Sequence, residues 1–292
     1  MSNFVVSDIT TLLSMQAFSY EDAINSDYLP PVSRWLAIEP LLPQVVKSNK
    51  TGRKTKPNQQ MFAAIYYRMR TGCQWKALPK CLGAASTVHD RHQRWVATGV
   101  YETLWEHGLL QLNVEGRLDW SFQSIDGCTT KAPLGGQATG ANPTDRGKKG
   151  TKRHLLTETN GLPVSLLVTG ANVHDKTQAE ALLVAMPFLP PAPEGDHELH
   201  FCADKAYDSA DVRSAIGLLG YRDHVKSRGQ ETTARQDEPG YRARRWVCER
   251  THSWMNRYRG LLIRWEKKVA NYRALLCLAC AHVVWKRSII FG

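Results

Sequence analysis

The stretch Arg153-His-Leu-Leu-Thr-Glu-Thr-Asn160-Gly161-Leu-Pro-Val-Ser-Leu-Leu-Val-Thr-Gly170 predicts a β-hairpin. Two runs rich in strand-favouring residues, 153–159 and 163–170, flank Asn160-Gly161, the dipeptide most typical of a tight hairpin turn. A third run, residues 120–129, alternates apolar and polar residues ahead of the hairpin. We therefore expect three consecutive antiparallel strands, with Asp126 within the first.

The residues that follow alternate between helix and strand patterns. We expect a helix from Asp175 or Thr177 to Ala185, a strand at 199–203 that ends directly before Asp204, a helix at 208–219 and a strand at 222–226. With an arginine-rich helix at the end, the order is β-β-β-α-β-α-β-α. That order predicts an α/β fold, a ribonuclease-H-like core with a mixed five-stranded sheet and helices.

The last helix of this order is expected within Tyr241–Arg259. An apolar stripe at helical spacing would pack against the sheet and consists of Val247, Thr251, Trp254 and Tyr258. Glu249 lies off the stripe, on a polar and mostly cationic face made of Arg242, Arg245, His252, Ser253, Asn256 and Arg257. Such a face suits a phosphate backbone, and Arg242, Arg245 and Arg257 are candidate DNA contacts. The alternative is a surface helix on which Glu249 merely pairs with Arg245.

Three acids occupy corresponding places in the predicted core. Asp126 lies on the first strand, Asp204 ends the fourth, and Glu249 lies on the last helix. The first and fourth strands are neighbours in a ribonuclease-H-like sheet, so these carboxylates would converge and repel one another unless cations neutralise them. We predict a site for two Mg²⁺ ions, with Mn²⁺ able to substitute, that serves phosphoryl transfer.

Other polar residues near these acids have competing interpretations. Asp208 is interpreted as a helix cap rather than a metal ligand, and Asp175 either caps a helix or supports the site together with His174. Lys152 and His154, on the second strand beside Asp126, are candidate contacts to a DNA phosphate.

The residues that precede the core have sequence patterns typical of helices. Residues 1–30 are expected to form an N-terminal arm, residues 31–116 an all-α DNA-binding domain and residues 117–292 the catalytic domain. A helix capped by Asn58 and a second capped by Ser86 have the pattern of a helix-turn-helix unit. In that unit the second helix would contact DNA through Thr87, Arg91 and Arg94, although helical hairpins without DNA-binding function are common.

Charge and composition limit the classes of partner that the protein can have. The net charge is +11, and Gly240–Gly292 alone holds twelve Lys and Arg residues against Glu249 and Glu266. A concentrated basic segment indicates a polyanionic partner. Seven cysteines without framework spacing fit reduced thiols. With no apolar stretch of membrane-spanning length and no leader pattern, we expect a cytoplasmic protein without a membrane partner.

Eight short stretches together resemble the DDE transposases of bacterial insertion sequences, in particular the insertion-sequence-five family. They are Trp35–Pro43, Arg70–Pro79, Ser86-Thr-Val-His, Ile125-Asp-Gly, Lys152-Arg-His, Ala171-Asn-Val-His-Asp175, Ala203-Asp-Lys-Ala-Tyr-Asp208 and Val247-Cys-Glu-Arg-Thr251. The resemblance implies a catalytic triad of Asp126, Asp204 and Glu249. The related signature Tyr-x2-Arg-x3-Glu-x6-Lys is only partly met, because Arg242 holds the tyrosine position and Asn256 the lysine position.

We therefore expect a transposase that binds the terminal inverted repeats of its insertion sequence, cleaves a DNA strand at each end and joins it to target DNA. Pairing of two ends implies a homodimer. Two alternatives are a structure-selective nuclease that uses the same core without strand transfer, and a DNA-binding regulator with an inactive core. The intact set of three acids argues against the regulator.

Overall fold

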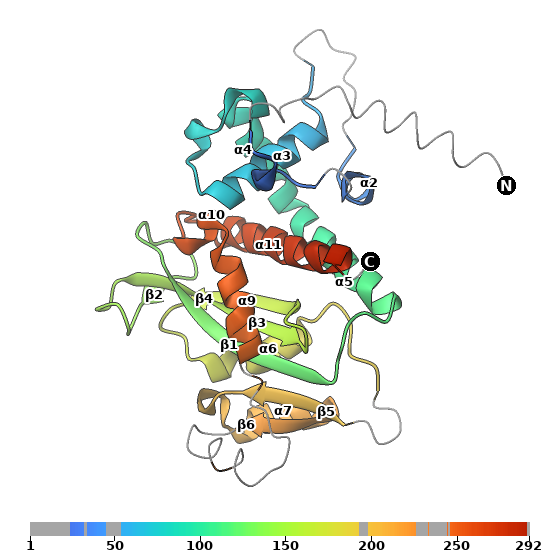
Figure 1. The fold of residues 1–292 in the computed structure, drawn as a ribbon. Helices are drawn as coiled ribbons and strands as arrows, with labels where there is room; N and C mark the ends of the chain where they lie inside the picture. Colours follow the sequence, from blue (N-terminus) through green and yellow to red (C-terminus); the bar gives the residue numbers. More distant parts are fainter. Residues whose placement is uncertain are drawn as a thin grey trace, which may run out of the picture. The chain divides into compact units, whose positions relative to one another are not determined.

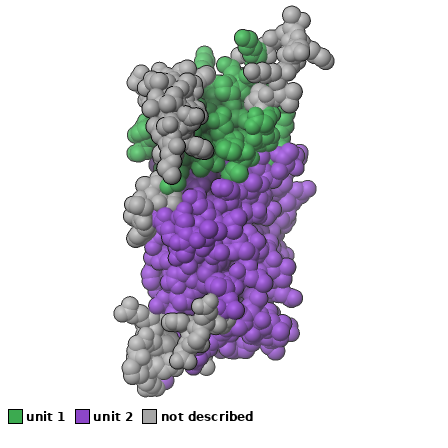
Figure 2. Space-filling view, turned by 90° about the vertical axis from the view of Figure 1, so that its right-hand side faces the viewer, with its two compact units in different colours: residues 1–95 green, residues 96–292 purple. Residues whose placement is uncertain are grey.

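The computed structural model describes residues 24–31, 34–44, 54–192, 198–225, 233, 244 and 246–290. The chain forms two compact units, residues 1–95 and 96–292, which Figure 2 distinguishes by colour. The division falls within helix α4 (Ala85–Ala97). Helix α5 (Val100–Val114), which the predicted boundary at residue 116 assigns to the helical domain, packs on helix α11 (Val269–Ile290) and belongs to the second unit.

The described part of the first unit is helical. Besides α4, its elements are η2 (Ser26–Tyr28), α2 (Trp35–Ile38), η4 (Glu39–Leu41), α3 (Asn58–Thr71), η5 (Trp75–Ala77) and η6 (Lys80–Leu82). Phe62 lies between Trp35 and Trp95, with ring centroids 6.2 Å from each. The predicted cap Asn58 is the first residue of α3, because Pro57 holds the cap position. The Asn58 side chain instead donates a hydrogen bond to the Pro43 carbonyl at 2.9 Å.

The second unit is built on a six-stranded mixed sheet (Figure 1). Its strands are β1 (Phe122–Lys131), β2 (Gly140–Ala141), β3 (Lys149–Glu158), β4 (Pro163–Gly170), β5 (Leu199–Ala203) and β6 (Tyr221–Val225). β3 pairs antiparallel with β1 on one side and with β4 and the short β2 on the other, while β1, β5 and β6 run parallel. The predicted ribonuclease-H-like arrangement is confirmed, with β2 as a strand that the sequence did not predict.

The remaining helices of this unit surround the sheet. They are η7 (Asp175–Gln178), α6 (Ala179–Val184), η8 (Lys205–Tyr207), α7 (Ala210–Leu218), α9 (Trp246–Asn256), α10 (Arg259–Leu262) and α11. Helix α9 lies across β1 and β3, α6 packs on β3 and β4, and α7 packs on β6 (Figure 1). Among the described helices, including the long α11, none combines the length and apolarity needed to cross a bilayer.

The glycine-rich segment between β1 and β3 is anchored by a fully buried arginine. The Arg264 guanidinium donates hydrogen bonds to the carbonyls of Gln137 and Ala138 at 2.5 and 3.0 Å, and to Thr151 Oγ1 at 3.0 Å. Its Nε also donates to the Glu266 carbonyl at 2.9 Å. Because these acceptors belong to segments far apart in the sequence, one side chain fixes the segment against the body of the unit.

Candidate active site

Asp126 within β1 and Asp204 directly after β5 lie at corresponding positions of two neighbouring parallel segments. The parallel register pairs Ser124 on β1 with Cys202 on β5, and each acid lies two residues further along its strand. Burial, together with the smaller effect of the negative charges of Asp204, Glu249 and Asp175, raises the pKa of Asp126 to about 6. Asp126 is therefore within electrostatic range of both other predicted acids.

The structure also separates Asp204 from its rival Asp208. Asp204 caps η8, and its Oδ1 accepts a hydrogen bond from the Ala206 amide at 2.8 Å. Asp208 instead forms an exposed ion pair with Arg213, at 3.0 Å. The predicted capping role of Asp208 is wrong, because Ser209 caps α7.

Glu249 is exposed on α9, and the Asn160-Gly161 turn fixes that helix against the sheet. The Thr251 hydroxyl donates to the Gly161 carbonyl at 2.6 Å, and Arg250 Nη2 donates to the Asn160 carbonyl at 2.6 Å. Gly161 has φ +85°, a conformation that L side chains rarely adopt. The hairpin turn that the sequence predicted thus also determines where α9 carries Glu249. Arg242 and Arg245 lie outside the described residues, so the structure does not address their predicted roles.

His252 was expected on the polar face of α9 but is buried, 4% exposed. Burial, with a smaller effect of nearby Arg153, lowers its pKa to about 3, so the ring is neutral at pH 7. Arg153 Nε donates to His252 Nδ1 at 3.3 Å. Because that arginine nitrogen can only donate, the ring proton lies on Nε2, which faces the Asp126 carbonyl at 3.4 Å. Arg153 also donates to Asn256, the residue at the lysine position of the partly met signature.

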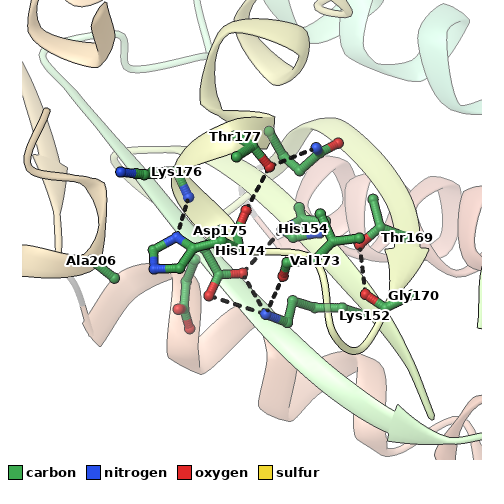
Figure 3. A network of polar contacts seen from close by, with 12 residues as sticks. Lys152, His154, Thr169, Gly170, Val173, His174, Asp175, Lys176, Thr177 and Ala206 are labelled. Carbon is green, nitrogen blue, oxygen red and sulfur yellow. Dashed lines mark hydrogen bonds and ion pairs between the residues drawn. The ribbon is translucent and has the colours of Figure 1, made fainter. Parts of the chain in front are cut away.

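Lys152 and His154 face Asp175, as Figure 3 shows. Lys152 Nζ lies 3.1 Å from Asp175 Oδ1, and His154 Nδ1 lies 3.3 Å from the same oxygen. The His154 side chain is fully buried, and its Nε2 contacts Thr169 Oγ1 at 2.7 Å, so it offers no surface to DNA. Sequence reasoning treated Asp175 mainly as a helix cap, but His174 caps η7.

Tyr207 is a residue of the site that sequence reasoning missed. It is 1% exposed, and its hydroxyl has no hydrogen-bond partner among the described residues. Burial raises its pKa, and the charges of Asp175 and Asp126 raise it further, so the phenol stays protonated beside the acids. Its place in Ala203-Asp-Lys-Ala-Tyr-Asp208, three residues after Asp204, was the available signal.

We call Asp126, Asp204 and Glu249 the acid cluster. The predicted DNA contacts outside it divide into two groups. Thr87 and Arg94 on α4 and Arg257 after α9 are exposed. Arg91 is 9% exposed and donates hydrogen bonds to the Asn58 side chain and to the Lys56 carbonyl. It belongs to the buried stripe of α4, which consists of Val88, Arg91, His92 and Trp95. Arg91 therefore ties α4 to the start of α3, and the expectation that it reaches DNA is not met in this structure.

The acid cluster fits divalent cations in its chemistry. Carboxylate oxygens are the ligands that Mg²⁺ and Mn²⁺ prefer. The raised pKa of Asp126 reflects a charged form that burial and neighbouring acids penalise, and a cation would relieve that penalty. Within the part of the chain that the structure describes, no three acidic, histidine or cysteine side chains converge on one point as ligands of a single ion do.

Two family models match the chain. "Putative transposase of IS4/5 family" matches residues 33–105, and "Transposase DDE domain" matches residues 119–284. A Burkholderia cepacia relative named "Putative transposase for insertion sequence element IS402" is 38% identical over 151 residues, which cover 50% of this chain and 68% of the relative. The "Insertion element IS402 uncharacterized 16.2 kDa protein" of the same organism is 32% identical over 113 residues, 37% of this chain and 77% of that protein.

Among solved structures, the catalytic domain of Mos1 mariner transposase matches at 12% identity with a TM-score of 0.28, over 63% of this chain and 91% of that one. That likeness is too loose to bear on individual residues. The DDE domain model, in contrast, spans more than half of the chain and all three predicted acids. The chain therefore belongs to the DDE transposases of bacterial insertion sequences.

Proposed function

We propose that this transposase binds the terminal inverted repeats of its insertion sequence, hydrolyses one strand at each end to free a 3′-hydroxyl and joins that hydroxyl to target DNA. Two observations support the proposal: the register of β1 and β5 sets Asp126 and Asp204 at corresponding positions, and the charges of Asp204 and Glu249 act on the pKa of Asp126. Structural ion pairs usually match acids with bases, whereas this group sets acids against one another.

Each acid would contribute carboxylate oxygens from a different element. Asp126 lies on β1 and Asp204 follows β5, both part of the sheet, whereas Glu249 projects from α9. Sheet and helix together therefore determine the spacing of the three groups. Residues on rigid elements hold a reacting phosphate more precisely than residues on loops, which favours in-line displacement.

Asp126, Asp204 and Glu249 would hold two Mg²⁺ ions, with Mn²⁺ able to substitute. When bound, such ions supply activation of the attacking water or 3′-hydroxyl and stabilisation of the leaving oxygen. The chain's own part is to orient these carboxylates and to place the scissile phosphate. His252 would assist by holding the β1 backbone at Asp126, because its protonated Nε2 faces the Asp126 carbonyl.

Binding of the DNA ends would draw on both units. Thr87 and Arg94 lie on the exposed side of α4, the second helix of the proposed helix-turn-helix unit, and would read the inverted repeat or its phosphates. Arg257, and also Arg242 and Arg245 outside the described residues, would hold phosphates near the scissile one. Because both ends are joined together, we propose that a homodimer assembles on the paired ends.

The decisive experiment combines cleavage, strand transfer and binding on DNA that carries the element's ends. Asp126→Asn, Asp204→Asn and Glu249→Gln should each abolish cleavage in Mg²⁺ while leaving affinity for end DNA nearly intact, because basic contacts dominate that affinity. Asp208→Asn is the matched control and should cleave normally. Normal cleavage by Asp204→Asn together with loss in Asp208→Asn would overturn the assignment. Cleavage without strand transfer by the wild-type protein would favour the structure-selective nuclease.

A further inference from the structure

A fourth carboxylate, that of Asp175, lies beside the acid cluster, and the proposed chemistry gives it no part. Two basic side chains on β3 face it: Lys152 Nζ contacts Oδ1 and Oδ2 at 3.1 and 3.2 Å, and His154 Nδ1 lies 3.3 Å from Oδ1 (Figure 3). Lys152 Nζ also donates to the Val173 carbonyl at 2.9 Å. The carboxylate therefore has little freedom to turn.

Asp175 is also pressed against the backbone of the residue that follows Asp126. A β-carbon added at Gly127 would lie 2.3 Å from Asp175 Oδ1, much closer than real β-carbons approach an oxygen. Only a residue without a side chain leaves room for the carboxylate at that place. The Gly of Ile125-Asp-Gly and the Asp of Ala171-Asn-Val-His-Asp175 thus fit each other in space, although the strands β2, β3 and β4 separate them along the chain.

Burial opposes the charge of Asp175, but the hydrogen bonds and charges of His154 and Lys152 outweigh it and lower the pKa of this carboxyl, so its negative form is favoured. It adds to the charges that raise the pKa of Asp126, so the protein places a negative group where negative groups already repel. A neutral amide would accept a weaker hydrogen bond and would leave the Lys152 ammonium without its counter-charge. The carboxylate therefore matches the Lys152 ammonium, and its close approach to Gly127 sets this ion pair against the residue that follows Asp126.

We propose that Asp175 is a positioning residue for Asp126. The Lys152–Asp175 ion pair, packed on Gly127, fixes the β1 backbone at Asp126–Gly127 and so directs the Asp126 carboxylate toward Asp204 and Glu249. Asp175 is not assigned contact with substrate or ion; it acts through Asp126. This inference rests on the proposed function, since it presumes that the direction of the Asp126 carboxylate matters for divalent-ion binding and strand cleavage.

The test uses the full chain and compares wild type, Asp175→Asn, Gly127→Ala, Asp175→Ala and the double variant Gly127→Ala/Asp175→Ala. Mn²⁺ affinity is measured without DNA, from the paramagnetic resonance signal of the free ion, and single-turnover cleavage and end-DNA affinity are measured beside it. Residues that orient metal ligands typically affect metal affinity or activity by about tenfold to a hundredfold. We expect Asp175→Asn to weaken Mn²⁺ binding by about tenfold and to slow cleavage similarly, with end-DNA affinity within about twofold of wild type.

The double variant tests the packing on Gly127. Gly127→Ala alone forces the new methyl group into the Asp175 carboxylate, whereas the Asp175→Ala background removes that collision. We therefore expect the loss of Mn²⁺ affinity in the double variant to be no larger than in Asp175→Ala alone, a non-additive result typical of residues in contact. Losses that multiply would contradict the proposal.

Two controls separate the possible failures. Asp208→Asn, which breaks an exposed ion pair outside the cluster, should keep wild-type Mn²⁺ affinity and cleavage. If Asp126→Asn abolishes both but Asp175→Asn lowers only the free energy of unfolding and leaves Mn²⁺ affinity unchanged, Asp175 is merely structural and the inference is overturned. If Asp126→Asn itself binds Mn²⁺ and cleaves normally, the proposed function fails first.

Discussion

Replacing Asp126 by Asn should stabilise the metal-free protein at neutral pH although it removes a proposed metal ligand. Burial, with the charges of Asp204, Glu249 and Asp175, raises the pKa of Asp126 from 3.8 to about 6. A carboxyl whose pKa rises on folding binds its proton more tightly in the folded state. The wild-type protein therefore loses stability as pH increases from about 4 to about 6, and Asn, which cannot ionise, loses none.

The size of the effect follows from the shift. Two pKa units correspond to about 3 kcal/mol at 1.36 kcal/mol per unit. Because the Asp126 side chain is 34% exposed, solvent screening reduces this, and we expect about 1 kcal/mol. At pH values above the raised pKa, the free energy of unfolding of the variant should exceed that of wild type by this amount. Below about pH 4 the two should be nearly equal, because the carboxyl is largely protonated in both the folded and the unfolded state.

Urea unfolding of EDTA-treated protein at about pH 4 and about pH 7.5, at constant ionic strength, measures the difference directly. Mg²⁺ added at the higher pH should stabilise wild type more than the variant, because an ion bound to the folded state adds its binding free energy. The difference in stability between variant and wild type should then shrink or change sign. Equal stabilities at neutral pH, or a gap that does not change with pH, would refute the electrostatic reasoning.

Two further predictions concern buried arginines. Arg264→Ala removes a fully buried guanidinium that binds the carbonyls of Gln137 and Ala138. Trypsin should therefore cleave the folded wild-type protein slowly after Lys148 or Lys149 but the variant quickly. Equal protection of the two proteins from trypsin would contradict the anchoring role. Arg91→Ala should lower the free energy of unfolding by about 1.5–3 kcal/mol, the value of hydrogen bonds to charged groups. Arg94→Ala should lower it by less and should weaken the preference for end DNA over random duplex. A reversed pattern in these two assays would restore Arg91 as the DNA contact.

Much of the second unit followed from local sequence patterns. The strands predicted at 163–170 and 199–203 have the bounds of β4 and β5, and the Asn160-Gly161 turn lies where the dipeptide indicated. Strand periodicity and turn chemistry act over a few neighbouring residues, so a single sequence carries them. The order of the elements then placed Asp126 and Asp204 on adjacent strands before any contact was known.

The contacts between distant segments were decided by the tertiary structure. The apolar stripe of an arginine-rich helix does not show how much of its other face is covered. In the structure, contacts of α9 with the Asn160-Gly161 turn and with Arg153 leave His252 buried. Alternation along β3 likewise sends Arg153 to one face and Lys152 and His154 to the other, but only the helices packed on each face decide what these side chains meet. Asp175 beside Gly127 is the clearest case, because each residue satisfies its own local pattern and the reason for both appears only when η7 is packed against β1.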